Sequence, residues 1–393
     1  IEWREWMYDV HLPGLEKWVF PLIDDKLVRE VKPLRAYDHL LDLVDEAGDR
    51  HEHSLALSEV HTDGLTRFTY RFLRDVTFAV AERLLALGVR PGDRVVISGR
   101  NQPGWPIAYF GILRAGGVAV PVDPALDGAQ MLNIVRSSAA SVAVIDEGVA
   151  GKGHDVVRAA LPNLAVVDMK SLEAISDQEA KAARARGGAS APSPEDVASL
   201  IYTSGTTGEP KSVMLTHRNF ASLLAALAPI FQLSPRDRVL SVLPLHHTFE
   251  FSCGMLLPLM SGARVLYLRE LSGDGLSEGF AKGHVTAMAG VPALWQMLER
   301  RIVSQVQERG PAATKAFDVA LELNRLLGKT TGLNAGRLFF GAIHERFGGN
   351  VRHLISGGAA LPRDTAKLFA GLGLPLSEGY GLTEASPVLT VSK

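Results

Sequence analysis

The sequence has little cysteine and little net charge. Cys253 is the only cysteine among 393 residues, which excludes disulfides within the chain and zinc sites built from several cysteines. The formal charge is only −2, so no strong long-range field attracts nucleic acid or an anionic membrane. We therefore expect small molecules as partners and no nucleic acid, and the lack of disulfides favours a cytoplasmic location.

Long uncharged runs are also missing. The longest one in the most apolar region, residues 251–263, is too short to cross a bilayer, and the first residues do not resemble a signal peptide. Trp3, Trp6 and Trp18 lie among mixed charges in a predicted N-terminal arm, residues 1–35. The arm either packs on the core or makes peripheral contact with the inner face of a membrane. The oligomeric state is not predicted.

Apolar residues make up 47% of the chain and charged residues 21%, which is typical of a globular protein. Strand patterns and helix patterns alternate along most of the sequence, and this alternation predicts an α/β fold with doubly wound, mostly parallel sheets. We expect one large domain over residues 36–393. Within it we predict a first sheet unit over 36–180, a surface linker rich in Ala, Gly and Pro over 171–194, and a second unit over 195–393.

The stretch "YTSGTTGEPKSVML", residues 202–215, nearly matches the phosphate-binding signature GxxxxGK[ST]. Pro210 stands where that signature requires glycine, and the residues after Lys211 read as a strand instead of a helix. The stretch is therefore predicted to be a strand-loop-strand unit and not a P-loop. Its hydroxyl groups, glycines and lysine suit a polyphosphate, while a plain surface hairpin is the alternative.

A second glycine-rich region follows a predicted βαβ pattern over residues 351–380. It places Gly357, Gly358 and the loop "EGYGLTE" at the carboxyl ends of parallel strands, where open α/β sheets bind ligands. The glycines would admit a flat ring on which Tyr380 stacks. Glu384 would then point to the phosphate end, where Mg²⁺ is commonly held by a carboxylate with phosphate oxygens. A solvated acid in a turn is the alternative for Glu384.

Two adjacent histidines, His246 and His247, lie at the start of an apolar run. No third ligand accompanies them at a suitable spacing, so they do not form a recognisable metal site. A core position is the alternative for each of them.

The sequence resembles the adenylate-forming (AMP-binding) superfamily, which includes acyl-CoA synthetases, nonribosomal adenylation domains and firefly-type luciferases. "YTSGTTGEPKSVMLTH" is similar to its phosphate-loop motif and "GYGLTE" to its adenine and Mg²⁺ motif. Ser212 departs from the glycine that the family usually has. "GVPALWQMLERRI" and the helical stretch after it resemble bacterial long-chain acyl-CoA synthetases, and the likeness covers residues 35–393.

This resemblance implies the large-domain fold of those synthetases, with two sheets, flanking helices and a small β subdomain. It implies ATP-dependent activation of a long-chain fatty acid to an acyl-adenylate, followed by thioester formation with coenzyme A, with Mg²⁺ as cofactor. A fatty carboxylate is itself the nucleophile, so no general base is needed. An acyl-adenylate ligase that loads an acyl carrier protein and a non-catalytic acyl or nucleotide-binding homologue are the alternatives.

In relatives, a ribose-binding aspartate and a C-terminal lid with a catalytic lysine follow the stretch where this sequence ends. We therefore expect the lid to be absent and the chain alone to be weak or inactive in the full reaction.

The resemblance also implies roles for individual residues. The catalytic residues would be Thr203, Lys211, His247, Thr383 and Glu384. The nucleotide would contact Thr203, Ser204, Gly205, Thr206, Thr207, Gly208, Lys211, Gly357, Gly358, Ala359, Glu378, Gly379, Tyr380, Gly381 and Thr383. The acyl pocket would contain His247, Phe249 and Trp295, although Trp295 reads equally well as a core tryptophan. Mg²⁺ would be held by Glu384 and Thr206.

Overall fold

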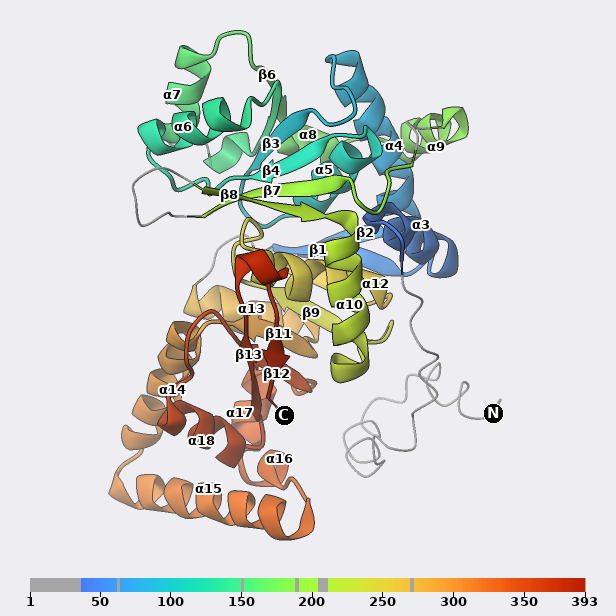
Figure 1. Ribbon diagram of the computed structural model, residues 1–393. Helices are drawn as coiled ribbons and strands as arrows, with labels where there is room; N and C mark the ends of the chain where they lie inside the picture. Colours follow the sequence, from blue (N-terminus) through green and yellow to red (C-terminus); the bar gives the residue numbers. More distant parts are fainter. Residues whose placement is uncertain are drawn as a thin grey trace. The chain divides into compact units, whose positions relative to one another are not determined.

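The computed structural model describes residues 37–61, 64–149, 152–187, 191–203, 211–268 and 272–392. The chain divides into two compact units, Ile1–Arg35 and Ala36–Lys393. The predicted N-terminal arm lies outside the described residues. The second unit contains two sheets with helices packed against them (Figure 1). None of its described helices is long and apolar enough to cross a membrane.

The smaller sheet has six strands in the order β6-β5-β3-β4-β7-β8. Its strands are parallel except for the antiparallel pair β7 and β8. The inner strands β3, β4 and β5 are almost entirely apolar and buried, as expected where helices cover both faces of a parallel sheet. The bounds are β3 Arg94–Ser98, β4 Val118–Pro121, β5 Val142–Ile145, β6 Ala165–Asp168, β7 Val197–Thr203 and β8 Lys211–Thr216.

The larger sheet has eight strands in the order β14-β13-β12-β11-β9-β10-β1-β2. It is parallel from β13 to β1 and ends in an antiparallel pair at each edge. The predicted α/β fold with two mostly parallel sheets is therefore confirmed. The bounds are β1 Leu55–His61, β2 Gly64–Thr69, β9 Arg238–Ser241, β10 Arg264–Leu268, β11 Ala287–Gly290, β12 His353–Ser356, β13 Leu376–Tyr380 and β14 Thr390–Val391.

Helices connect and cover these strands (Figure 1). Those associated mainly with the smaller sheet are α4 Tyr70–Ala86, α5 Gly104–Arg114, α6 Gly128–Ser138, η3 Glu147–Val149, α7 Lys152–Ala160, α8 Met169–Glu173 and α9 Asp177–Arg186. The remaining helices are α3 Leu40–Arg50, α10 His217–Phe231, α11 Thr248–Glu250, the π-helix η4 Phe251–Leu256, α12 Leu257–Met260, α13 Gly273–Gly283, α14 Pro292–Gln307, α15 Pro311–Thr331, α16 Gly336–Phe339, α17 Gly341–Arg346, α18 Arg363–Gly371 and η5 Thr383–Ala385.

The two faces of the larger sheet differ in what they bury. Leu240, Leu266, Met288 and Leu354 point into an apolar core that also contains Trp295. Because side chains alternate along a strand, their sequence neighbours point to the opposite face. That opposite face is packed against η4 and carries the buried Glu59 and Tyr267 toward its β1 edge.

The predicted division into two sequential sheet units is wrong at two hairpins. Strands β1 and β2, predicted with the first unit, belong to the larger sheet, since β1 pairs in parallel with β10 through Leu57 and Val265. Strands β7 and β8, predicted with the second unit, extend the smaller sheet, since Ser199 pairs with Ala119 of β4. A local strand pattern does not say which sheet the strand joins, because that choice depends on packing between segments far apart in the chain.

The predicted surface linker and the predicted small β subdomain also differ from the structure. The predicted linker over 171–194 contains the regular helix α9, which is held on α4 by ion pairs of Arg83 with Glu179 at 2.9 Å and of Arg186 with Glu82 at 2.7 Å. Every strand within the described ranges belongs to one of the two sheets. The separate small β subdomain that the resemblance implied is therefore not found there.

Candidate active site

The predicted phosphate loop joins two paired strands. β7 and β8 are antiparallel, with Thr203 opposite Lys211 and Tyr202 opposite Ser212. The Oγ1 of the half-buried Thr203 lies 3.5 Å from the Lys211 carbonyl oxygen, while the Lys211 side chain is exposed. The helix α10 begins only after Thr216, whose side chain caps it. The strands on both sides of the loop are thus as predicted, and no helix N-terminus follows Lys211 directly.

Several predicted nucleotide contacts fall within residues 204–210, which lie outside the described ranges. These are Ser204, Gly205, Thr206, Thr207 and Gly208. Their roles remain predictions from the resemblance.

The two glycines after β12 stand where a larger residue would clash or be strained. A Cβ atom on Gly357 would lie 2.7 Å from Cζ of Phe249, so the Phe249 ring packs directly on this glycine. Gly358 has a φ of +80°, in the left-handed region that favours glycine. Both Gly358 and Ala359 are exposed. Phe249 and Gly357, predicted for the acyl pocket and the nucleotide respectively, are therefore in contact.

The loop after β13 presents an exposed aromatic ring. Tyr380 is 62% exposed, as a ring that stacks on a ligand would be. Gly381 is required here, because a Cβ would meet the Pro387 carbonyl oxygen at 1.6 Å. Gly379 on the strand is half-buried. The Glu378 carboxylate accepts a hydrogen bond from the Leu361 amide at 2.9 Å, so it ties β13 to the loop after β12.

The segment after β13 lies against the strand that follows the predicted phosphate loop. The short helix η5, which carries Thr383 and Glu384, lies against β8, which begins at Lys211 (Figure 1). Thr383 is half-buried and Glu384 is exposed. No group of three or more His, Cys, Asp or Glu side chains in the described ranges could hold a metal ion. A divalent ion at Glu384 would therefore depend on oxygens from a ligand.

The two histidines occupy different environments. The Nε2 atom of the half-buried His246 lies 3.8 Å from Asp123 Oδ2, and its ring centroid is 4.3 Å from that of His247. Burial, reinforced by His247, lowers the pKa of His246 to about 4, so His246 is neutral at physiological pH. His247 is exposed at the N-terminus of α11, and it is the histidine available to a ligand.

A cavity of about 210 Å³ lies beside His246. Its walls are the segments that follow β3, β4 and β9, together with Leu268 at the end of β10. The chain leaves β3 and β4 toward opposite sides of the smaller sheet, and it leaves β9 and β10 toward opposite sides of the larger one. Such a pair of neighbouring strands marks a topological switch point, where open α/β sheets bind ligands. The cavity is bounded by one switch point from each sheet, between β3 and β4 and between β9 and β10.

An apolar crevice lies between η4 and one face of β9, β11 and β12. Its lining includes Cys253, Ala289 and Ile355. It has room for about 10 Å³, which is at most the space of one water molecule of about 10–15 Å³. The crevice is thus packed shut.

Trp295 lies on the other face of the same sheet. It is fully buried, its ring centroid is 5.7 Å from that of Phe369, and it packs on Gly290. Gly290 and Gly357 are joined by a hydrogen bond of 3.0 Å between the Gly357 amide and the Gly290 carbonyl. The rings of Trp295 and Phe249 therefore pack on neighbouring glycines from opposite faces. The structure places Trp295 in the core and does not bring it together with Phe249.

Sequence reasoning missed Glu250 and Asn101. Glu250 is fully buried, and burial raises the pKa of its carboxyl group to about 8, although Ser241 and the amides of Val242 and Leu243 oppose the rise. Neither carboxyl oxygen makes a well-formed hydrogen bond with the described residues. One signal was available for Glu250: it is an acid at the edge of the longest uncharged apolar run. Asn101 gave no such signal.

Comparison with known proteins gives a family and a fold. A sequence profile of the family described as "AMP-binding enzyme" matches residues 44–393. Long chain acyl-CoA synthetase 7, peroxisomal, from Arabidopsis thaliana is 30% identical over 336 residues, which are 79% of this chain and 47% of that protein. The long-chain-fatty-acid–CoA ligase heimdall from Drosophila melanogaster is 27% identical over 371 residues, which are 84% of this chain and 54% of that protein. The chain thus spans about half the length of these relatives.

Solved structures share the fold. The crystal structure of VinN matches with a TM-score of 0.68 at 22% identity, covering 91% of this chain and 79% of VinN. The N-terminal domain of FACL13 from Mycobacterium tuberculosis also matches with a TM-score of 0.68 at 22% identity, covering 90% of this chain and 78% of that domain.

Proposed function

Because this chain belongs to the AMP-binding enzyme family, we propose that it is the ATP-binding and acyl-binding part of a long-chain fatty acid–CoA ligase. The matched plant and fly relatives carry that activity in their names. The observation that supports the proposal is the contact of η5, which carries Thr383 and Glu384, with β8. β8 begins at Lys211, which pairs with Thr203 of β7.

In the first step, a carboxylate oxygen of the fatty acid forms a bond to the α-phosphorus of ATP, and the bond from that phosphorus to pyrophosphate breaks. The carboxylate is ionised at neutral pH, so no proton has to be removed. Lys211 and the neighbouring hydroxyls stabilise the charge that develops on the phosphate oxygens. Tyr380 would stack on the adenine, and His247 would lie between the carboxylate and the α-phosphate.

The described residues fit a magnesium ion only in part. Glu384 offers one exposed carboxylate and no cluster of acids surrounds it. Mg²⁺ commonly keeps several waters and binds through one or two carboxylates and substrate phosphates, which matches this arrangement. Glu384 and Thr206 would hold the ion, and it would supply positive charge to the phosphates.

The acyl chain is proposed to enter beside Phe249, into the crevice between η4 and the larger sheet. The crevice is apolar, and its lining extends to Ile355, two residues before Gly357. Because it holds only about 10 Å³, η4 or its side chains must move to admit an alkyl chain. Trp295, on the opposite face, would contact that chain only after leaving the core.

The second step is proposed to use the 210 Å³ cavity beside His246. There the thiol of coenzyme A would lose its proton to water and attack the acyl carbonyl carbon. A C–S bond would form, and AMP would leave with the electrons of the broken C–O bond. A carrier protein presents the same kind of thiol arm, so the cavity is equally compatible with that acceptor. We propose a cytoplasmic location, with peripheral membrane contact as the alternative.

The test is ATP–pyrophosphate exchange by the full-length protein with fatty acids of graded length. Long-chain fatty acids should support exchange, and Lys211→Ala should lower the rate by about 100-fold or more, the usual loss when a donor to a charged transition state is removed. Lys181→Ala, an exposed lysine on α9, is the matched control and should leave the rate unchanged. Absence of exchange with every fatty acid would refute the proposal. Supplying coenzyme A or an acyl carrier protein then identifies the acceptor.

A further inference from the structure

Asn101 lies three residues after the end of β3 in the smaller sheet, yet its side chain bonds to the larger sheet and the segment that leaves it. Its Nδ2 atom donates to the Leu243 carbonyl oxygen at 2.6 Å and to the Ser241 hydroxyl at 3.0 Å. Its Oδ1 atom accepts from the Leu245 amide at 3.0 Å. All three bonds go to the end of β9 and the segment that follows it, which carries His246 and His247.

This segment, residues 242–247, has no regular structure between β9 and α11. Backbone groups in such a segment lack the partners that a sheet or helix would provide, and they need others when water is excluded. The Leu243 carbonyl and the Leu245 amide lie on either side of Pro244, which has no amide proton of its own. The Asn101 side chain therefore provides the hydrogen bonds to this backbone that a neighbouring strand would otherwise provide.

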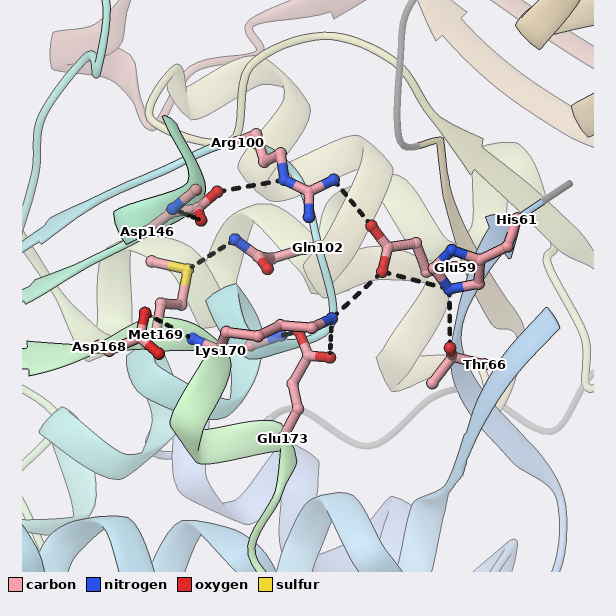
Figure 2. A network of polar contacts seen from close by, with 12 residues as sticks. Glu59, His61, Thr66, Arg100, Gln102, Asp146, Asp168, Met169, Lys170 and Glu173 are labelled. Carbon is pink, nitrogen blue, oxygen red and sulfur yellow. Dashed lines mark hydrogen bonds and ion pairs between the residues drawn. The ribbon is translucent and has the colours of Figure 1, made fainter. Parts of the chain in front are cut away.

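The neighbours of Asn101 are themselves fixed in position, as Figure 2 shows. Arg100 bonds Glu59 of the larger sheet at 2.9 Å and Asp146, at the end of β5 in the smaller sheet, at 3.2 Å. Glu59 is fully buried. Gln102 lies against the Met169 sulfur at 3.5 Å (Figure 2). Asn101 is thus held from both sides and offers a rigid donor and acceptor to the histidine segment.

We propose that Asn101 is a positioning residue for His247. Asn101 also borders the 210 Å³ cavity proposed for the thioester step. In the adenylation step it acts by fixing the backbone from which α11 starts and at whose end His247 is presented. This inference rests on the proposed function, in which His247 lies between the fatty carboxylate and the α-phosphate.

The chemistry of the site selects asparagine. The side chain donates two hydrogen bonds from one nitrogen, to Ser241 and Leu243, and accepts a third from the Leu245 amide. A carboxamide makes all three without charge, whereas a neutral imidazole has only one N–H donor. Asn101→Asp preserves shape and keeps the acceptor, but it places an oxygen against the Leu243 carbonyl. Asn133→Asp, on the exposed face of α6, makes the same chemical change away from the segment.

The test is a double-mutant cycle in the full-length protein, measured by ATP–pyrophosphate exchange. Asn101→Asp should lower kcat by about 10-fold or more and leave KM for ATP within about threefold, because the loss is in positioning and not in nucleotide binding. In a His247→Ala background the same substitution should lower kcat by less than about twofold, since coupled residues do not add. Equal losses in both backgrounds would overturn the inference. Asn133→Asp should match the parent protein in each background.

Hydrogen exchange gives a readout that does not depend on activity. Peptides covering residues 242–250 should exchange faster in Asn101→Asp than in the parent protein or in Asn133→Asp, and unchanged exchange there would also overturn the inference. If the parent protein catalyses no pyrophosphate exchange, the proposed function fails while this readout still tests the contact. Should Asn101→Asp not fold, Asn101→Gln, which sets the same amide one methylene further out, takes its place in both experiments.

Discussion

Replacing Glu250 by glutamine should remove a pH dependence from the stability of this protein. Glu250 lies fully buried where α11 meets the π-helix η4, and Gly254 makes room for it, since a Cβ there would approach Oε1 to 2.2 Å. Burial raises the pKa of the carboxyl group from an ordinary value of 4.5 to about 8. Glu250→Gln preserves the shape of the neutral acid and cannot ionise.

The size of this pH dependence follows from the difference in proton binding between the folded and unfolded states. Between the two pKa values the folded state holds a proton that the unfolded state has lost, so stability falls as pH rises through this window and levels off above the folded pKa. Integrating from pH 5 to pH 8 with 1.36 kcal/mol per pKa unit gives a loss of about 3.5 kcal/mol in the free energy of unfolding. The nearby Cys253 and Tyr267 do not titrate in this range, because burial raises the pKa of Cys253 to about 12 and raises that of Tyr267 well above its ordinary value of 10.0.

The assay is urea unfolding at several pH values across that window, followed by tryptophan fluorescence. Trp105 is buried with its ring centroid 5.9 Å from that of Phe251 in η4, so its emission reports on this region. The stability of the parent protein should fall relative to that of Glu250→Gln by about 3.5 kcal/mol from pH 5 to pH 8. Glu308→Gln, at an exposed position, should keep the parental dependence. Parallel curves for the parent protein and Glu250→Gln would refute the reasoning.

Two further substitutions test contacts around the site. Gly357→Ala should destabilise the fold by about 1–3 kcal/mol, the usual cost of overpacking, because its Cβ would meet the Phe249 ring at 2.7 Å. Adding Phe249→Leu should restore part of this stability, as measured by urea unfolding. If it restores none, the contact between Phe249 and Gly357 is contradicted. Glu59→Gln should cost about 1.5–3 kcal/mol, the usual contribution of hydrogen bonds to a charged group, because Arg100 and Lys170 lose the buried carboxylate that they share. Both cations are partly exposed and keep a second acidic partner, Asp146 or Glu173. A decrease in the free energy of unfolding of less than about 1 kcal/mol in the same assay would show that this ion-pair network contributes little to stability.

The sequence by itself determined the local structure and the family. Continuous apolar runs such as "RVVIS" specified buried strands, and Pro210 with the strand after Lys211 excluded a P-loop, because both depend on neighbouring residues along the chain. The motifs at Tyr202 and Tyr380 were long enough to indicate the AMP-binding family, which the match over residues 44–393 confirms.

Only the tertiary structure decided which strands are neighbours. Every residue type except proline offers the same backbone hydrogen bonds. The sequence of β1 therefore does not say that β10 lies beside it, nor does that of β7 say that β4 does. Packing between distant segments makes that choice. The contacts of Phe249 with Gly357 and of Asn101 with the histidine segment follow from it, as does the burial of Glu250. Each is an arrangement of residues far apart in the chain, which no local pattern specifies.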